Sequence, residues 1–462
     1  MQLIDAHERC RESLIWAIGQ LKGRVEPAQL DSIAELIIQT MTGTWRYFHT
    51  PEHIFEVGGS QDPIEVLAAL FHDMVYVQVD QGVNLNIGRY ITPFVREKGQ
   101  LTIHPREELS QDRMFEIVAT IFGFVPSQAL SPFAGQNEFL SAIVAAKCLE
   151  PFLAPGLIAQ IVACIEATIP FRSHNESGLT PAERLLERMR QANEQFNFGW
   201  TETETVDAVK RSVRLANRDV ENFASPSSAN FLDNTWNLIP ETNHELITAA
   251  YGVGDYRRSM QKMQGFMSFL KPEVVFHQFR GEPDDETYRS LLAQTQKNLD
   301  VAKLYLGVKL VTMAILEALS YRLGQNIPLS TMMGEFPVPG IAISTLEQFL
   351  PDIQVADPAK TPLENEVVEL LDKGRNQESR YDIKNSPLST FIIKSIGFVE
   401  MNRLLLLTKK MFDGQMSGEE FLSHCDAEMI DTIVSSVAQL FESRTKALRG
   451  FNLSKVKLEL SR

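Results

Sequence analysis

The sequence has few cysteines, and they show no paired spacing. The four cysteines, Cys10, Cys148, Cys164 and Cys425, lie far apart, and none belongs to a C-x-x-C pair. Two of them fall in apolar runs, where a reduced thiol packs as a small hydrophobic side chain. This pattern favours a reducing compartment.

The sequence also lacks a hydrophobic run long enough to predict a membrane span. One uncharged apolar stretch, residues 151 to 165, is interrupted by Pro155 and Gly156, and it is shorter than the roughly 20 residues that cross a bilayer. The N-terminal segment carries Asp5 and Glu8 where a signal peptide would need a basic start and an apolar core. We therefore expect a soluble, cytoplasmic protein without membrane association.

Basic residues are outnumbered by acidic ones. Lys and Arg total 44 against 59 Asp and Glu, which gives a formal net charge of -15. This balance disfavours a broad electrostatic interaction with nucleic acid or with an anionic membrane. A local basic pocket remains compatible with it.

Helical periodicity is the dominant pattern that the sequence does contain. The chain has 462 residues, 44% of them hydrophobic, and is longer than one typical domain. Almost every long segment repeats apolar residues at intervals of three and four, and no convincing alternating strand pattern interrupts them. The sequence therefore predicts an all-α fold.

Polar and proline-rich stretches divide the chain into three predicted regions. Residues 225–241, SPSSANFLDNTWNLIPE, are interpreted as a connection that closes a first domain, residues 1–240. Residues 241–325 predict long helices that pack on the first domain or on a second subunit, so a homo-oligomer is one option. Residues 326–462 begin with proline-rich loops and continue as a C-terminal helical domain of unknown role.

Two histidines, His49 and His53, flank a predicted helix start. Thr50 is a suitable N-cap and Pro51 a suitable first helical residue, so His53 should project from the first turn while His49 stays on the incoming chain. A fixed ring suits a metal ligand, and an adjustable ring suits proton transfer or a phosphate contact. The alternative is two histidines near a helix cap with no shared role.

His72 and Asp73 lie side by side where a second predicted helix ends. This helix should begin at Asp62-Pro63, with Glu65 completing a capping box. An imidazole beside a carboxylate at a helix end is a ligand pair suited to Zn, Fe, Mn or Co. The dipeptide alone is a weak signal, and the preceding H-x3-H pattern strengthens it.

Asp219 is the candidate for a second carboxylate ligand. Apolar residues recur at intervals of three and four over residues 205–223, and Asp219 borders the resulting stripe. A carboxylate in such a poorly solvated position needs a partner. Either a metal ion or an ion pair with Arg214 or Arg218 would provide one.

This ordered series of motifs resembles the HD-domain superfamily of metal-dependent phosphohydrolases. The likeness is greatest to the small bacterial group described as predicted HD phosphohydrolases, and it is more distant to the cyclic-nucleotide phosphodiesterases. It covers roughly residues 40 to 225, about half the chain, within the predicted first domain. The motifs are, in order, Arg46 with His49-x3-His53, ALFHDMVY with His72-Asp73, Asn137-Glu138-x2-Ser141-Ala142, IEAT ending at Thr168, and Asp219.

The resemblance implies a helical bundle whose metal ligands lie on facing helices. The ligands would be His53, His72, Asp73 and Asp219, and Asp73 could bridge a second ion such as Mg. His49 would be the acid that protonates the leaving oxygen. The metal would be a divalent transition ion, Mn, Fe, Co or Zn, which lowers the pKa of its bound water to about 7 and polarises a phosphoryl oxygen.

The implied reaction is hydrolysis of a small phosphate ester, with a nucleotide as the expected substrate. Arg46 and Arg218 are candidates for binding its phosphate, and surface ion pairs would explain them equally well. Glu138 is expected to support the ligands or to orient the substrate, with a helix N-terminal acid as the alternative. A di-iron oxygenase of HD type and a non-catalytic HD scaffold for sensing or protein interaction are competing hypotheses.

Two features depart from related groups. Tyr76 stands where some relatives carry His, Lys or Glu, which disfavours the alarmone hydrolases and the HD-GYP cyclic-diguanylate enzymes. Residues 77–136 are longer than the small bacterial group would require and predict either a lid or a structural insertion. His104 and His174, in polar loops, are further candidates for the pocket unless they are simply solvated.

Overall fold

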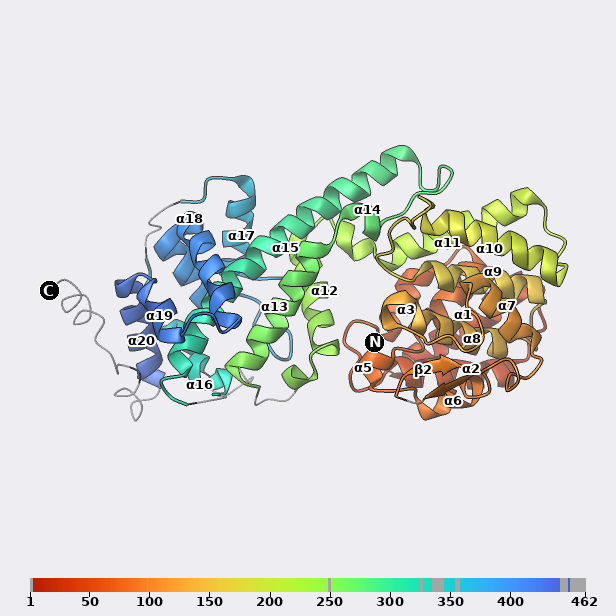
Figure 1. Cartoon of the computed structure of the whole chain (residues 1–462), viewed down its shortest axis with the longest axis horizontal. Coiled ribbons are helices and arrows are strands. Elements are labelled where there is room, and N and C mark those ends of the chain that lie inside the picture. The colour runs from red at the N-terminus through yellow and green to blue at the C-terminus, as the bar shows by residue number, and fades with distance from the viewer. Residues whose placement is uncertain are drawn as a thin grey trace. The chain divides into compact units, whose positions relative to one another are not determined.

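Nearly all regular structure in this computed structural model is helical (Figure 1). The structure describes residues 3–97, 99–247, 251–324, 327–334, 345–353, 358–440 and 448. Helices make up 68% and strands 3%, which confirms the predicted all-α class. None of the helices in the described ranges is both long enough and apolar enough to cross a membrane.

The chain forms two compact units, each made of two separate stretches. Unit 1 comprises residues 1–224 and 271–295, and unit 2 comprises residues 225–270 and 296–462. This division differs from the three predicted regions, because residues 271–295 belong with the first domain while residues 225–240 do not. The side-chain amide of Asn217 exchanges hydrogen bonds of 2.8 and 2.9 Å with the backbone of His277, which ties the returning stretch to unit 1.

Unit 1 is built around two buried helices, α4 (Pro63–His72) and α9 (Pro155–Ala167). The other helices of the unit are α1 (Leu3–Gln20), α2 (Pro27–Met41), α3 (Pro51–Gly58), α5 (Val77–Asp80), α6 (Leu85–Ile91), α7 (Arg113–Phe122), α8 (Gln136–Leu149), α10 (Pro181–Phe196), α11 (Glu202–Asp219) and α14 (Pro272–Val275). Both central helices are buried on nearly every side, as their apolar sequences require. α9 packs against α4, α7, α8 and α11, and α4 also packs against α1 and α3.

The start of α4 confirms one sequence prediction and corrects another. Asp62 caps the helix by accepting hydrogen bonds from two backbone N–H groups, and Pro63 is the first helical residue. The predicted capping box is wrong, because the Glu65 carboxylate accepts hydrogen bonds from Arg214 and Arg218. Glu65 therefore joins α4 to α11.

The other two helices that carry candidate ligands also have defined ends. α3 begins at Pro51 directly after Thr50, as predicted. α11 begins earlier than predicted, because Thr201 and Glu204 form a capping box. It ends at Asp219, so this carboxylate lies in the last turn of the helix.

Residues 77–136 are mostly part of the unit 1 framework. They form α5, α6, α7 and an antiparallel hairpin of β1 (Val95–Glu97) and β2 (Leu101–Ile103), in which Val95 pairs with Ile103. This hairpin was not predicted, because strands of three residues are too short to show alternation. α7 is buried against α8, α9 and α10, which favours a structural insertion over a lid.

Unit 2 contains a helix where the sequence predicted a connection. α12 (Ser228–Glu241) buries Phe231, Leu232 and Trp236, and Ser227 caps its start. The Ser, Asn and Pro residues of this segment resemble a loop, so the helix was not predicted. In the structure one of the serines is the N-cap, and Pro240 lies in the last turn.

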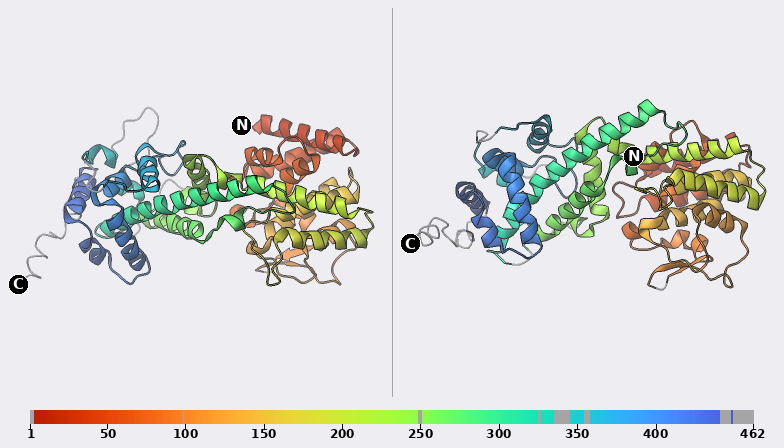
Figure 2. Two further views of the ribbon diagram at one scale, coloured as in Figure 1. Left: turned by 90° about the horizontal axis from the view of Figure 1, so that it is seen from above. Right: turned by 45° about the horizontal axis from the view of Figure 1, so that its top comes forward.

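Unit 2 also contains helices of varied length. They are α13 (Val253–Phe269), α16 (Leu329–Met333), α17 (Pro362–Lys373), α18 (Pro387–Phe412), α19 (Gly418–Ser423) and α20 (Ala427–Leu440). α15 (Asp285–Ser320) gives its first turns to unit 1 and the rest to unit 2, and it is a single continuous helix in both views of Figure 2.

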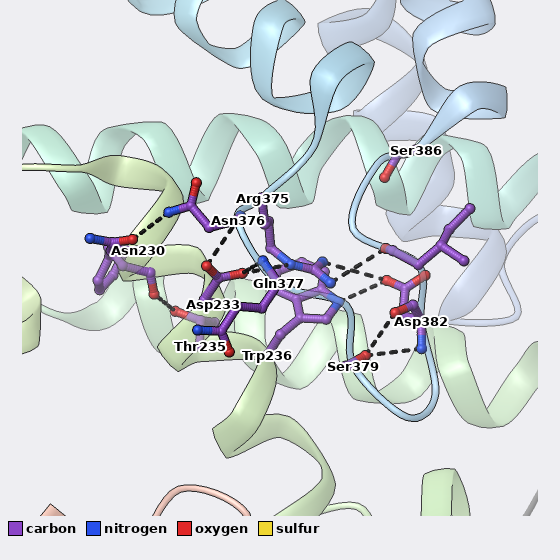
Figure 3. Close-up of polar contacts among 12 residues, drawn as sticks. Asn230, Asp233, Thr235, Trp236, Arg375, Asn376, Gln377, Ser379, Asp382 and Ser386 are labelled. Carbon is purple, nitrogen blue, oxygen red and sulfur yellow. Dashed lines mark hydrogen bonds and ion pairs between the residues drawn. The ribbon is translucent and has the colours of Figure 1, made fainter. Parts of the chain in front are cut away.

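A buried polar network holds the stretch between α17 and α18 (Figure 3). Asp382 Oδ2 accepts hydrogen bonds from Trp236 Nε1 at 2.7 Å, from Tyr256 at 2.6 Å and from Lys309 Nζ at 2.9 Å. The Arg375 guanidinium lies 4.3 Å from the centroid of the Trp236 ring. Burial raises the pKa of Asp382, but the charges of Lys309 and Arg375 outweigh burial and lower it.

Replacing Asp382 by alanine should strongly destabilise unit 2. The change leaves Lys309 buried without its carboxylate partner, and breaking a buried pair in this way costs about 3–5 kcal/mol. Asp372→Ala is the control, because Asp372 is exposed and its ion pair with Lys394 lies at the surface. Urea unfolding followed by tryptophan fluorescence measures both variants, and equal midpoints would contradict the role given to Asp382.

Candidate metal centre

Four side chains from three helices converge at one place in unit 1. His53 lies in the first turn of α3, His72 and Asp73 lie at the C-terminal end of α4, and Asp219 ends α11. One donor atom of each lies within 4.8 Å of the donor atoms of the other three. The structure thus brings together the four residues that were predicted as metal ligands.

The Nε2 atom of each histidine in this cluster faces both carboxylates. His72 Nε2 lies 2.9 Å from Asp73 Oδ2 and 3.3 Å from Asp219 Oδ1. His53 Nε2 lies 3.0 Å from Asp219 Oδ1 and 3.5 Å from Asp73 Oδ2. Two nitrogens and two oxygens therefore surround a common centre.

The environment of His72 fixes which of its ring nitrogens can bind a metal. Its Nδ1 lies 2.7 Å from the carbonyl oxygen of Ala69. Because a carbonyl only accepts hydrogen bonds, Nδ1 carries the proton, and Nε2 has a lone pair when the ring is neutral. Nε2 is buried and makes no hydrogen bond of good geometry within the described residues. A metal ion would satisfy this nitrogen.

The donor atoms of the cluster suit a divalent metal ion. Two imidazole nitrogens and two carboxylate oxygens form a mixed donor set that suits Zn, Fe, Mn or Co. The backbone carbonyl that orients His72 is the kind of outer partner that metal-bound histidines have. The residues present therefore fit the predicted cofactor.

Burial and charge shift the pKa values of all four groups. Burial lowers the pKa of His53, but its hydrogen bond to Asp219 and the charge of Asp73 outweigh burial and raise the pKa to about 9. Burial raises the pKa of Asp219, but the charge of His72 and the hydrogen bond from His53 lower it to about 2. By the same balance, the pKa of His72 is raised and that of Asp73 is lowered. The carboxylates thus stay ionised and require positive partners.

His49 lies beside this cluster without belonging to it. Its Nε2 is 4.0 Å from Asp73 Oδ2, and its ring meets the Tyr76 ring edge-on with centroids 4.8 Å apart. The ring centroids of His49 and His53 are 5.7 Å apart. His49 therefore lies next to the predicted ligand His53, and the separate role predicted for it stays a prediction.

Arg46 contacts the backbone of the predicted ligand Asp73, and its side chain has no exposed surface. Its Nε and Nη2 bind the carboxylate of Asp80 at 2.9 and 2.7 Å, and its Nη1 donates to the backbone carbonyl of Asp73 at 2.9 Å. This arrangement disfavours the predicted phosphate contact and makes Arg46 a residue that positions Asp73. Asp80 was missed by sequence reasoning, since no motif spacing connects it to Arg46.

Arg218 also uses its guanidinium within the protein. It donates to the carbonyl oxygen of Val57 at 2.7 Å and to Glu65 at 2.6 Å. The predicted phosphate contact is therefore disfavoured for Arg218 as well. The alternative partner that was considered for Asp219, an ion pair with Arg214 or Arg218, is not formed, because both arginines bind Glu65.

The Asn137 to Ser141 motif of α8 fixes the chain that follows His72-Asp73. Ser141 Oγ accepts a hydrogen bond from the N–H of Val75 at 3.0 Å, and Asn137 Oδ1 accepts one from Val77 at 3.2 Å. These contacts give the motif a positioning role, although the sequence predicted no specific partner for either residue.

Glu138 is the member of this motif with unusual ionisation. Its Oε2 atom is buried and has no hydrogen-bond partner within the described residues. Burial and the charges of Asp73 and Asp219 raise the pKa of Glu138 to about 7, although the charge of Arg172 opposes this shift. The carboxyl group can therefore gain or lose a proton near neutral pH.

The other predicted residues take structural or solvent-exposed positions. His104 contacts Glu108 and the carbonyl oxygen of Thr92, and His174 is exposed. The Thr168 hydroxyl donates to the carbonyl oxygen of Ile165 within its own helix end. None of the three belongs to the four-residue cluster.

The chain matches no protein-family model, no curated protein and no solved structure. The metal centre therefore rests on the geometry and chemistry of its own residues.

Metal affinity should rise with pH up to about 9, the raised pKa of His53. In the metal-free protein His53 is protonated below its raised pKa of about 9, so an ion must displace that proton. Asp219, with a pKa of about 2, is already ionised at neutral pH and releases none. Titration calorimetry in buffers of different ionisation enthalpy measures the protons released per ion. At pH 7.5, which lies below the raised pKa of His53, release of at least one proton is expected, and release of none would contradict this account.

Proposed function

We propose that this protein is a metal-dependent phosphohydrolase or phosphodiesterase that acts on a small phosphate ester, with a nucleotide as the preferred class. The observation that carries the proposal is the convergence of His53, His72, Asp73 and Asp219 from three helices. The resemblance of the motif order to the HD superfamily supports the same reaction class.

The exposure of the cluster supports a catalytic site better than a closed structural one. The His72 side chain is 1% exposed, whereas those of Asp73 and Asp219 are 18% and 15% exposed. A catalytic site keeps one position open for water, and four protein ligands leave such a position on an ion that takes five or six ligands. When bound, a divalent ion supplies Lewis-acid activation of water and of a phosphoryl oxygen.

The protein's own residues supply proton transfer next to this centre. His49, which lies beside Asp73 at the edge of the cluster, is placed to donate a proton to the leaving oxygen. Glu138 has a pKa of about 7 and can accept a proton at neutral pH. Arg46 holds the backbone of Asp73, so the ligand keeps its orientation during the reaction.

Loss of a ligand should abolish both metal binding and catalysis. We expect Asp219→Asn to lower the rate with p-nitrophenyl phosphate or bis-p-nitrophenyl phosphate by roughly a thousandfold or more, because removing a ligand removes the activation by the metal. The matched control is Asp207→Asn, an exposed carboxylate on the same helix. Metal content by mass spectrometry accompanies each assay in the presence of Mn, Fe, Co or Zn.

Two results would contradict the hydrolase proposal. One is a wild-type protein that takes up no stoichiometric metal and releases no phosphate with any of these ions. The other is oxygen consumption by the iron-loaded protein without hydrolysis of either ester, which would favour the oxygenase alternative.

Glu138→Gln should remove the acidic limb of the pH–rate profile. The glutamine cannot ionise, so the rise in rate around pH 7 should disappear and the rate should fall by about 10²–10⁴-fold, as for other general bases. Glu150→Gln, at the other end of α8, is the control. An unchanged pH profile in Glu138→Gln would show that this carboxyl group transfers no proton in the reaction.

A further inference from the structure

Three arginines gather around one carboxylate in unit 1. Glu166, at the end of α9, is fully buried and binds Arg172 and Arg188, each with a shortest contact of 2.6 Å. Arg184 precedes Arg188 by one turn of α10. Two guanidinium groups thus bind a single buried anion, and the charges of Arg172, Arg188 and Glu166 all act on the third, Arg184.

Two of these arginines are fixed by several contacts with the protein. Arg172 also donates to the carbonyl oxygens of Ile169 and Glu166. Arg188 also donates to the carbonyl oxygens of Phe122 and Arg184. These two side chains therefore provide a rigid positive framework.

Arg184 differs, because it makes fewer contacts with the protein and one of its donors is buried without an acceptor. Its Nη2 donates to the carbonyl oxygen of Ser173 at 3.3 Å. Its Nε is buried and has no hydrogen-bond partner within the part of the chain that the structure describes. A buried guanidinium N–H without an acceptor is unfavourable, so Arg184 lacks an acceptor group.

Two histidines lie near these arginines. His174 follows directly after Ser173, and His277 is held by the Asn217 side chain. Burial, together with the charges of Arg172, His174 and Arg184, lowers the pKa of His277 to about 4. His277 is therefore neutral at physiological pH and can donate or accept a hydrogen bond.

Helix α11 connects these arginines and histidines with the candidate metal centre. Asn217, which holds His277, lies two residues before Asp219 in α11. The charges of Arg172, Asp73 and Asp219 all act on Glu138, which places these groups in one electrostatic neighbourhood.

We propose that Arg184, supported by Arg172 and bordered by His174 and His277, forms an oxyanion-binding site that takes a phosphate group. A phosphate offers several acceptor oxygens to the guanidinium fork, including one for the unpartnered Arg184 Nε. Anion binding stands on this geometry alone, whereas its assignment to a phosphate of the substrate rests on the proposed function.

The test is calorimetric titration of inorganic phosphate into full-length protein that has been stripped of metal with EDTA. Wild-type protein should bind phosphate, and Arg184→Gln should bind it roughly tenfold more weakly or worse, since a charge-assisted bidentate contact is lost. Arg190→Gln is the matched control, because Arg190 lies on the same helix and pairs with Glu202 at the surface. Its phosphate affinity should equal that of the wild type.

A second arm repeats the titration with a nucleoside monophosphate and with metal-loaded protein. Tighter binding of the nucleotide than of inorganic phosphate, with the same dependence on Arg184, would assign the site to the substrate. Equal affinities of the two, both dependent on Arg184, would support a site for free phosphate.

Three results would overturn the oxyanion site. They are no phosphate binding by the wild type, equal binding by Arg184→Gln and wild type, and binding that requires metal but not Arg184. The last result would leave the hydrolase proposal intact. Conversely, Arg184-dependent binding by a protein that never hydrolyses an ester would retain the oxyanion site and reject the hydrolase.

Circular dichroism checks that the variants fold. If Arg184→Gln unfolds, Arg184→Lys replaces it, because lysine keeps the charge without the guanidinium fork.

Discussion

The structure of unit 1 depends on one constraint: two ionised carboxylates and two imidazoles face one another in a poorly solvated place. Charges in such surroundings are unfavourable unless each has an opposite partner in good geometry. In the metal-free state, protons on His53 and His72 provide the positive charge, and a divalent ion can take their place. The same electrostatic requirement that stabilises the cluster therefore makes it a metal site.

Contacts that do not involve the ligand atoms hold this arrangement. Arg46 fixes the backbone of Asp73 while Asp80 neutralises its charge, and Glu65 joins α4 to α11 through two arginines. Two side chains of α8 accept hydrogen bonds from the backbone that follows Asp73. The ligands sit on helix ends, where rigid elements meet, and this placement can maintain a coordination geometry without a bound ion.

The ligand residues could be predicted from local sequence because local rules determine where their side chains point. Thr50-Pro51 starts the helix whose first turn carries His53. Asp62 caps the start of α4, which ends at His72. The apolar stripe of α11 has Asp219 at its edge. All-α architecture followed from the same periodicity. These features require only capping preferences and a 3.6-residue repeat.

Features that depend on distant contacts could not be predicted in this way. The partners of Arg46 and Arg218 are 34 and 153 residues away, so the sequence could not show that ion pairs within the protein, the alternative to a phosphate contact, engage both guanidinium groups. α12 was missed because its Ser and Asn residues resemble a loop, although its apolar residues are buried in unit 2. The division into units was also missed, because the chain returns to unit 1 through residues 271–295 and the Asn217 to His277 contacts.

An anomalous-scattering map from crystals loaded with Mn or Zn tests the central claim most directly. The account predicts one strong peak at about 2.0–2.2 Å from His53 Nε2, His72 Nε2 and an oxygen of each of Asp73 and Asp219. A map without a peak there, or a peak bound by other residues with Asp219 turned away, would contradict it.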